Sequence, residues 1–383
     1  MDANRASQAR CSDERKDKVK ILHVIDTLGR GGAERLLVML LPALARQGHA
    51  VAVAVCRAPY DLQPELEAGG VQVIRLPKRH KWNLVAGAHD IVRAMPDADI
   101  LHAHLYFPAV MTALARLTGL SRARTCVTFH NLAYAGANKD GPKLWVRRAL
   151  ARRVYRRGLD AKLAVSQAVA DHYRAALSLD LVDVVHNPID LAAVDAVMPA
   201  LRAADAPLHI VLPGRLVSEK GHEDLIAALR DPRLTGHSLA VTFAGHGPLQ
   251  AALKDRAAAL LFPVTITGNL DHRAFLEVIA SADIVVIPSR FEGFGLTALE
   301  AMGCAKPVIA STAGGLPEVV GETALSVPVG DVHAIAEAIC RLAEDPALRA
   351  RLGQAGRAQA EAAFSLSAIS AQLCATYDRL VAR

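Results

Sequence analysis

Two carboxylates in the stretch FEGFGLTALE, residues 291–300, are the side chains of this sequence best placed to do chemistry. Glu292 and Glu300 can accept hydrogen bonds from sugar hydroxyls. Gly293 and Gly295 permit a tight turn with exposed backbone N–H groups, and the residues that follow begin a helix whose N-terminus attracts anions. We therefore predict an anion pocket, such as a phosphate would fill, lined by two carboxylates.

Two cations follow another predicted strand, in the stretch LPGRLVSEKGHEDL. The strand ends at Gly214 and Arg215, and the short loop after it supplies Lys220. Arg offers a planar fork and Lys a point charge, which together suit a diphosphate. A structural salt bridge is the alternative interpretation.

Glycines also end the next two predicted strands. Gly245 lies in AGHGPL, residues 244–249, and TGNL, residues 267–270, brings Asn269 and Leu270 to the corresponding place one unit later. Each motif alone is a weak signal. Their succession predicts an open shelf on which a flat ring could lie.

The first half of the chain offers weaker candidates. Gly31 and Gly32 open a helix after the first strand, but Glu34 stands where a dinucleotide-binding fingerprint needs a small residue. A plain tight turn and a phosphate or acceptor contact both remain open there. His130 ends the strand RTCVTFH, where a side chain should reach the ligand, although it could equally be an ordinary polar strand end.

A pair of histidines, His102 and His104, lies two positions apart on one strand and so faces one side. A metal site needs a third ligand, and no Cys or carboxylate stands nearby in the sequence at ligand spacing. We therefore expect no metal site and no bound cofactor.

The strands that position these residues alternate with helical patterns throughout, which predicts two doubly wound parallel sheets of the α/β class. Ligands in such sheets bind beyond the carboxyl ends of the strands. We expect a tail at 1–18, a first domain at 19–190 and a second at 191–363, joined by a linker at 187–207 with three prolines. The predicted strands are 19–25, 50–56, 71–76, 99–104, 124–130, 161–166 and 182–187, then 208–214, 239–245, 264–269, 283–289, 306–311 and 323–328.

Composition limits the function. Aromatic residues make up only 4% of the chain, which argues against a stacking surface for nucleic acid. The net charge of +6 divides unevenly, because residues 1–190 hold 28 Lys and Arg against 18 Asp and Glu, or +10, whereas the remainder holds 16 against 20, or −4. Anionic phospholipid, a pyrophosphate-bearing substrate and mere compositional bias are all compatible with that basic half.

The location of the protein is predicted from its cysteines and its apolar segments. Six scattered cysteines without a CxxC pair predict free thiols and a cytoplasmic location. The longest apolar run, 36–45, is shorter than the ~20 residues that cross a membrane, so any membrane contact should be peripheral. The basic stretch 143–158 spreads its charges around a helical wheel, which weakens it as an amphipathic membrane helix.

The motifs together resemble a known family, the retaining glycosyltransferases of family 4, which have the GT-B fold. The resemblance rests on the Glu-x7-Glu of 292–300, the GR and EKG of 214–221, the GG turn at 31–32 and the run CAKPVIASTAGGLPEVV. It covers nearly the whole chain from residue 19. It implies two Rossmann-like domains facing a central cleft, with a final helix, 364–383, that packs back on the first domain.

The resemblance also implies roles for individual residues. Arg215 and Lys220 would hold the donor's diphosphate, Glu300 the ribose hydroxyls and Glu292 the hydroxyls of the transferred sugar, while His130 would contact that sugar near the reacting carbon. Asn269 and Leu270 would lie near the base, and Gly31 and Gly32 beside the diphosphate or the acceptor. The remaining donor-binding candidates are Gly214, Gly245, Gly293, Phe294, Gly295, Leu296 and Thr297.

The implied reaction moves a sugar, with retention at the anomeric carbon, from a nucleotide-sugar co-substrate to a glycan or a polyprenyl-diphosphate-linked acceptor in the synthesis of a cell-surface polysaccharide. A UDP-sugar is the donor that the resemblance favours. A GDP-mannose-dependent mannosyltransferase and a nucleotide-sugar epimerase on the same fold are the alternatives. No metal and no nucleic acid partner is implied.

Overall fold

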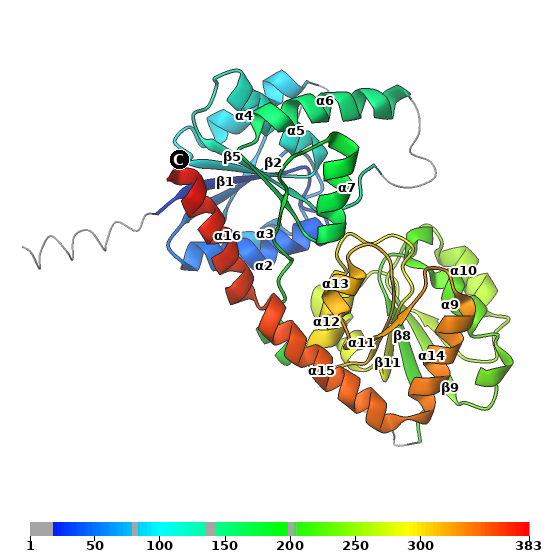
Figure 1. Cartoon of the computed structure of the whole chain (residues 1–383). Helices are drawn as coiled ribbons and strands as arrows, with labels where there is room; N and C mark the ends of the chain where they lie inside the picture. Colours follow the sequence, from blue (N-terminus) through cyan, green and yellow to red (C-terminus); the bar gives the residue numbers. More distant parts are fainter. Residues whose placement is uncertain (1–17, 79–82, 135–141, 198–202, 204, 383) are drawn as a thin grey trace, which may run out of the picture. The chain divides into compact units, whose positions relative to one another are not determined.

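The computed structural model describes residues 18–78, 83–134, 142–197, 203 and 205–382, which form two compact units. The first unit holds Met1–Val165, Ala170–Val185 and Ile369–Arg383. The second holds Ser166–Val169 and His186–Ala368. The chain thus enters the second unit and returns to the first at its C-terminal end (Figure 1).

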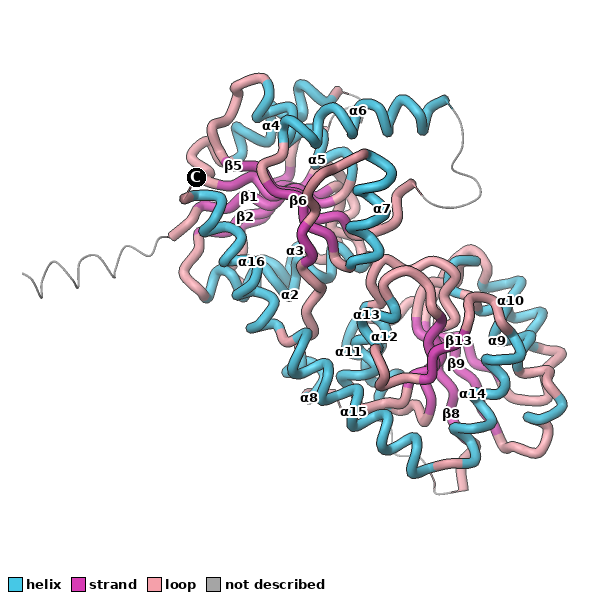
Figure 2. Tube along the Cα trace, in the orientation of Figure 1, coloured by secondary structure: helices cyan, strands magenta, loops and turns pink. Residues whose placement is uncertain are grey.

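The first unit is built on a seven-stranded parallel sheet in the order β3-β2-β1-β4-β5-β6-β7 (Figure 2). Helices α4, α5 and α6 lie on one side of this sheet, and α2, α3 and α16 lie on the other. The strands are β1 (Lys20–Ile25), β2 (Ala50–Val55), β3 (Gln72–Arg75), β4 (Ile100–His104), β5 (Arg124–Phe129), β6 (Ala161–Ala164) and β7 (Asp183–Val184). The helices are α2 (Gly32–Arg46), α3 (Gln63–Ala68), α4 (Leu84–Ala94), α5 (Tyr106–Leu117), α6 (Pro142–Gly158), α7 (Gln167–Leu177) and α16 (Leu366–Val381).

The two faces of this sheet differ in character. Leu22 and Leu101 join an apolar cluster with Ile91 of α4 and Met111 of α5. Because side chains alternate along a strand, the neighbouring positions point to the opposite face. These positions include His23 of β1 and His102 of β4, which are partners in the strand register. One face is therefore an ordinary core, while the other buries polar rings.

The second unit repeats the plan with a six-stranded parallel sheet in the order β10-β9-β8-β11-β12-β13. Its strands are β8 (Leu208–Pro213), β9 (Leu239–Ala244), β10 (Val264–Ile266), β11 (Ile284–Ile287), β12 (Val308–Ser311) and β13 (Leu325–Val327). Its helices are α8 (Leu191–Asp195), α9 (His222–Ala228), α10 (Gln250–Ala257), α11 (His272–Ala280), α12 (Leu296–Gly303), α13 (Leu316–Val320), α14 (Val332–Glu344) and α15 (Pro346–Phe364), with 3₁₀ turns η1 (Ser218–Lys220) and η2 (Pro232–Leu234). Leu212, Phe243 and Val286 centre its core, against Leu225 of α9 and Ile339 of α14.

The predicted α/β class and doubly wound parallel sheets are confirmed, and every predicted strand is present. The units divide between Val185 and His186, five residues before the expected boundary at 190, and α16 joins the first unit from Ile369. The expected linker 187–207 includes α8, and part of it, like most of the expected tail 1–18, lies outside the described residues.

Helix α6 departs from the prediction. Its charges were expected to leave no clean apolar face, yet Ala151, Val154 and Tyr155 are all buried. The spacing of these residues by three and four positions forms a stripe on one side of the helix. The charged side chains thus leave room for a narrow apolar stripe between them.

Gly221 provides a test of the local fold. It has φ of +70° as the N-cap of α9, and a Cβ there would approach the carbonyl oxygen of Pro288 to 2.1 Å. We expect Gly221→Ala to lower the free energy of unfolding by about 2 kcal/mol or more, because strain and overlap add. Gly236, where a Cβ would meet nothing within 4 Å, is the control, and Gly236→Ala should change it by less than about 0.5 kcal/mol. Equal losses in urea unfolding would contradict this account.

Candidate functional site

The strand order of the second sheet reverses between β8 and β11, which are neighbours in its centre. The connections that leave two such strands run to opposite faces of the sheet, and doubly wound sheets bind their ligands beyond the carboxyl ends of these strands. The loop after β8 carries Gly214, Arg215 and Lys220, and the loop after β11 carries Glu292 and Gly295. Topology therefore brings together two motifs that are more than seventy residues apart in the sequence.

An ion pair joins these two loops. Nζ of Lys220 lies 2.5 Å from Oε2 of Glu292, and the two side chains are only 17% and 15% exposed. The hydroxyl of Ser289 also donates to Oε2 of Glu292, at 3.4 Å. The ammonium and carboxylate are thereby fixed in place before any ligand arrives.

Arg215 differs from Lys220. Its side chain is exposed, and no described residue forms an ion pair or hydrogen bond with its guanidinium. It is therefore a cation available to an incoming anion. The alternative interpretation, a structural salt bridge, does not fit Arg215. Lys220, by contrast, is engaged in the ion pair, although its partner is the predicted site residue Glu292.

A second ion pair, which was not predicted, also holds these loops. Nε and Nη2 of Arg290 donate to the two carboxylate oxygens of buried Asp224 at 2.9 and 2.6 Å, and the Arg290 amide donates to the Glu219 carbonyl at 2.8 Å. The Asp224 carboxylate raises the pKa of Arg290. The sequence offers only the position of Arg290 beside Phe291 as a signal for this ion pair, because Asp224 lies 66 residues away in the chain.

Helix α12 begins at the second loop with unused donors. Gly295, its N-cap, has φ of +111°, and no side chain caps the helix. The hydroxyl of Thr297 in the first turn is buried and has no hydrogen-bond partner among the described residues. Phe294 turns its ring into the protein, so only its backbone can meet a ligand. Gly293, unlike Gly295, has no positive φ, so only Gly295 has a backbone conformation that favours glycine.

Glu300 lies on the second turn of α12, with its Oε1 3.7 Å from Nδ1 of His272. His272 is the first residue of α11, directly after the loop that holds exposed Asn269 and half-buried Leu270. The structure thus places Glu300 near the loop predicted to meet a base.

The glycine-rich strand ends also lie together. The Gly245 amide donates to the Thr267 hydroxyl at 3.1 Å, and a Cβ at Gly245 would overlap the carbonyl of Gly214. The three strand ends therefore pack edge to edge, as the predicted shelf requires. Beside them, His222 is buried with neither ring nitrogen hydrogen-bonded to a described residue, and burial, aided by the Lys220 charge, lowers its pKa to about 4.

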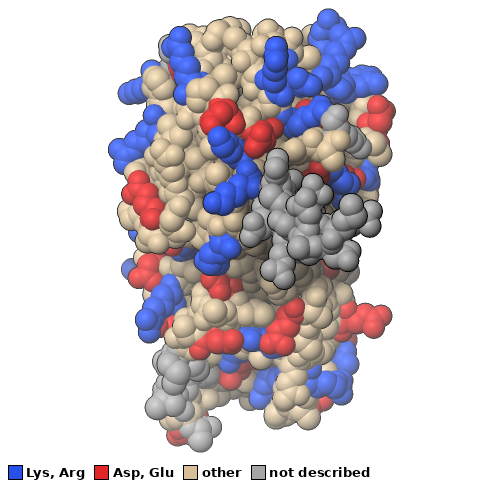
Figure 3. Space-filling view, turned by 90° about the vertical axis from the view of Figure 1, so that its left-hand side faces the viewer, with Lys and Arg blue, Asp and Glu red and all other residues tan. Residues whose placement is uncertain are grey.

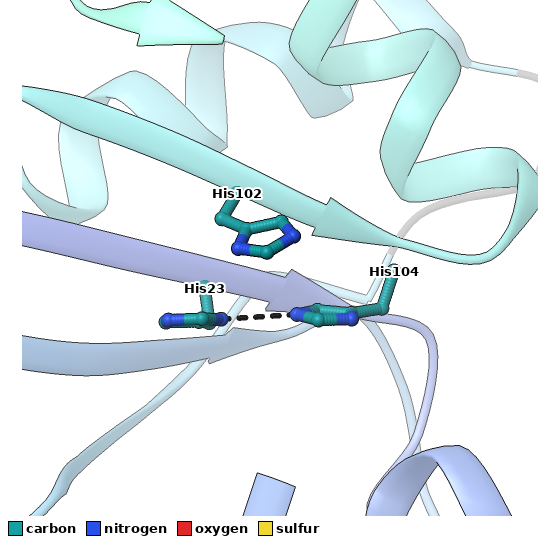
Figure 4. A group of neighbouring side chains, drawn as sticks. All are labelled: His23, His102 and His104. Atoms are coloured by element: carbon teal, nitrogen blue, oxygen red, sulfur yellow. Dashed lines mark hydrogen bonds between the residues drawn. The ribbon is translucent and has the colours of Figure 1, made fainter. Parts of the chain in front are cut away.

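In the first unit, the order reverses between β1 and β4, and a histidine cluster lies there. His23, His102 and His104 each offer a ring nitrogen within 4.8 Å of the others (Figure 4). The third ring, His23, was not considered with His102 and His104 in the sequence, because it comes from the neighbouring strand rather than from nearby in the chain. All six nitrogens of the three rings, however, already have hydrogen-bond partners in protein.

His130 adjoins this cluster just past the end of β5. Its Nε2 lies 2.9 Å from Nδ1 of His104, and burial lowers its pKa to about 4. Burial also lowers the pKa of His23, His102 and His104 well below the usual value, with a further contribution from neighbouring rings. All four rings are consequently neutral near pH 7.

The glycine turn before α2 has an acidic neighbour. Glu34 accepts a hydrogen bond from the Thr27 hydroxyl at 2.9 Å, and a side chain at Gly31 would meet its carboxylate. Neither Gly31 nor Gly32 has a positive φ. Burial raises the pKa of nearby Asp26, and the Glu34 charge adds to the effect.

Comparison with known proteins agrees with this arrangement. The family model "Glycosyl transferases group 1" matches residues 195–359, and "Glycosyltransferase Family 4" matches residues 30–193. Glycogen synthase of Mycobacterium tuberculosis is 30% identical over 389 residues, with 91% of each chain covered. The chain belongs to the family 4 glycosyltransferases.

Two further relatives of this glycosyltransferase cover different parts of the chain. A GDP-mannose-dependent phosphatidylinositol monomannoside mannosyltransferase of Corynebacterium glutamicum is 35% identical over 164 residues, which is 41% of this chain and 43% of the relative. The crystal structure of Anabaena HepE in complex with UDP superposes with a TM-score of 0.80 at 21% identity, covering 94% of this chain and 100% of that one. The latter likeness supports the GT-B fold.

Two further expectations concern the compartment. The five described cysteines of the glycosyltransferase are free thiols, as expected, and Cys11 lies outside the described residues. In the described part of the chain, every helix is too short or too polar to cross a bilayer.

The buried histidines predict a pH dependence of stability. Their rings are neutral when folded but protonate near pH 6.5 when unfolded, so the unfolded state binds more protons and stability falls as pH falls. Between pH 7 and pH 5 each of the four rings should cost about 2 kcal/mol. Urea unfolding at several pH values, monitored by hydrogen exchange of the β1 and β4 amides, measures this change in the free energy of unfolding. His333→Gln, which removes an exposed ring, should leave the slope unchanged, and a flat profile in the unaltered protein would refute the prediction.

Proposed function

We propose that this glycosyltransferase binds a nucleotide-sugar in its second unit and transfers the sugar with retention of anomeric configuration. The observation that carries the proposal is the Lys220–Glu292 ion pair at the reversal between β8 and β11. It sets a cation for the diphosphate beside a carboxylate for sugar hydroxyls. Exposed Arg215 adds a second cation, and the uncapped start of α12 adds unpaired N–H groups.

The remaining donor contacts follow from position. Glu300, near the 269–270 loop, suits the ribose hydroxyls, and Asn269 and Leu270 suit the base. The unpaired Thr297 hydroxyl is a donor that a phosphate oxygen would satisfy. Gly214 and Gly293 leave room beside these groups because they carry no side chain, while Gly245 lets its strand end pack against the Gly214 carbonyl.

The proposed chemistry is electrostatic. As the bond to the leaving diphosphate breaks, negative charge grows on its oxygen, and preorganised cations and helix N–H groups stabilise that charge. Lys220 needs no reorientation, because Glu292 already holds it. Glu292 is assigned to hydroxyl recognition and not to nucleophilic attack, since its carboxylate is committed to Lys220 and Ser289.

We assign the acceptor to the first unit. The Glu34 carboxylate near Gly31 repels phosphate but accepts hydrogen bonds from hydroxyls. Of the two alternatives at Gly31 and Gly32, we therefore favour a contact with the acceptor substrate over a contact with the diphosphate. His130 is proposed to meet the transferred sugar. A glycan or polyprenyl-diphosphate-linked sugar in cell-surface polysaccharide synthesis is the acceptor class we favour.

UDP is the nucleotide we propose, and the fold neighbour with bound UDP is compatible with it. A GDP-mannose donor is the second candidate, because a relative that shares 35% identity over 164 residues is named for that donor.

A binding panel tests the donor proposal. We expect saturation-transfer NMR with UDP-, GDP- and ADP-sugars to show binding of one nucleotide class. Glu300→Ala should weaken that binding at least tenfold, and Lys220→Ala should lower kcat/KM by about 100-fold, the usual effect of removing one stabilising donor. Glu277→Ala, an exposed carboxylate on α11, is the matched control. Unchanged turnover in both site variants would reject the assignment.

Peripheral membrane contact is proposed through α6. Opposite its buried stripe, this helix exposes Trp145, which is 72% accessible, and the side chains of Arg152, Arg153, Arg156 and Arg157. Arginines attract anionic headgroups, and Trp favours the interface of a bilayer. On the face drawn in Figure 3, by contrast, Lys and Arg side chains are interspersed with Asp and Glu.

Vesicle co-sedimentation tests this contact. We expect binding to vesicles with anionic phospholipid and none to neutral ones, with a decrease of at least tenfold in Arg152→Glu/Arg153→Glu, since each basic residue contributes about 1 kcal/mol. Arg341→Glu/Arg351→Glu makes the same charge change on exposed positions of α14 and α15. If both double variants lose binding equally, net charge and not α6 is responsible.

A further inference from the structure

A continuous chain of hydrogen bonds runs through the polar face of the first sheet. It starts at His130, crosses β4 and β1, reaches the hydroxyl of Tyr377 on α16 and returns to β5. The five links are His130 Nε2–His104 Nδ1 at 2.9 Å, His104 Nε2–His23 Nδ1 at 3.0 Å, His23 Nε2–Tyr377 OH at 3.4 Å, Tyr377 OH–His102 Nδ1 at 2.6 Å and His102 Nε2–Thr128 Oγ1 at 2.8 Å.

The chain is dry along most of its length. His23, His102, His104 and Tyr377 are each at most 1% exposed, and Thr128 is 6% exposed. Water therefore cannot replace a missing hydrogen bond there. In such surroundings an unmatched donor or acceptor is costly, so the five links must all be made at once.

Neutral imidazole has one donor nitrogen and one acceptor nitrogen. Each of the three inner rings uses both nitrogens in the chain, and the Tyr377 hydroxyl has two ring nitrogens as partners but only one hydrogen to donate. A ring that receives a hydrogen bond on one side must therefore donate on the other. Only two arrangements satisfy every link and also give the Tyr377 O–H hydrogen an acceptor, and they run in opposite directions.

The two arrangements have a simple signature. When every bond points from His130 toward Thr128, all four rings carry their proton on Nε2. When every bond points the other way, all four carry it on Nδ1. A change of direction between two rings would leave two N–H groups, or two bare nitrogens, facing each other. A change of direction at Tyr377 would leave its buried O–H hydrogen without an acceptor, or two bare nitrogens competing for that one hydrogen.

One nitrogen remains outside the chain. Nδ1 of His130 has no hydrogen bond to any described residue, and the His130 ring is half-buried at the carboxyl end of β5. In one arrangement this nitrogen is an acceptor, and in the other it is a donor. Its character depends on the direction of the five buried links.

We propose that this chain acts as one unit that fixes the tautomer of His130, with Tyr377 as a positioning residue that holds the two halves of the chain in one direction. The inference rests on the proposed function in one respect, that His130 meets the sugar donor. It adds that the hydrogen-bonding state which His130 presents is set from α16, through a residue that touches no substrate.

The same rings could instead hold zinc, since His23, His102 and His104 bring three nitrogens together. The hydrogen-bond chain accounts for all six of their nitrogens without a metal. A metal held by one nitrogen of each ring would need at least two of these bonds to be given up.

NMR of the full chain labelled with ¹⁵N-histidine tests the proposal directly, because long-range ¹H–¹⁵N spectra distinguish Nδ1–H from Nε2–H. We expect one shared tautomer for the four rings in the unaltered protein at pH 7.5. Two different tautomers among the four rings overturn the proposal. So does one equivalent of tightly bound zinc that shifts the ¹⁵N resonances of the rings. This measurement needs no variant and no substrate.

Tyr377→Phe then tests the positioning role. The change removes one hydroxyl and should release His130 into a mixture of tautomers, while Tyr173→Phe, a buried tyrosine outside the chain, should keep the shared tautomer. If the His130 tautomer is unaltered in Tyr377→Phe, the positioning role of Tyr377 is rejected. If Tyr377→Phe does not fold, Thr128→Val cuts the last link instead and is judged by the same signals.

Donor turnover separates this inference from the proposed function. We expect Tyr377→Phe to lower kcat about tenfold with little change in the KM for donor, and Tyr173→Phe to change neither. If the tautomer of His130 changes while both Tyr377→Phe and His130→Ala keep full activity, the chain exists but the proposed contact between His130 and the donor is wrong. If tautomers are mixed in the unaltered protein, the chain is wrong whatever the activity.

Discussion

The reversal of strand order at the centre of each sheet is the constraint on which both candidate sites depend. Connections from β8 and β11 diverge to opposite faces, so the residues just after them are left together with no helix between them. Lys220 and Glu292 meet for that reason, although 72 residues separate them. The same reversal between β1 and β4 sets His23 beside His102.

The two units use the residues at their strand-order reversals in different ways. In the second unit the loops are held by ion pairs, with Asp224 buried under Arg290 and Glu292 against Lys220, and charge is left available at Arg215. In the first unit the corresponding strands carry neutral rings that satisfy one another. The reversal in the second unit presents charged side chains, while the reversal in the first unit determines which ring nitrogens carry a proton.

Local patterns in the sequence were enough to predict the strands, the α/β class and the loops that carry Arg215, Lys220 and Glu292, because buried parallel strands and their glycine endings are contiguous in the chain. The partners of polar side chains were not predictable in this way. Asp224, which pairs with Arg290, reads as one more acid in a helix, and Tyr377 reads as an apolar position of the final helix. His23 escaped notice as a third ring because the register between β1 and β4, rather than spacing, brings it there. Whether each site residue acts on a substrate stays a prediction.

The return of α16 to the first unit has a consequence for how the protein is made. Tyr377 hydrogen-bonds to His102, 275 positions earlier in the chain. A ribosome releases the β1 and β4 histidines long before it reaches that tyrosine, and the whole second unit is synthesised in the interval. His23 and His102 therefore cannot make their hydrogen bonds to Tyr377 until the second unit has been synthesised. The second unit, by contrast, can complete its own core as soon as α15 emerges.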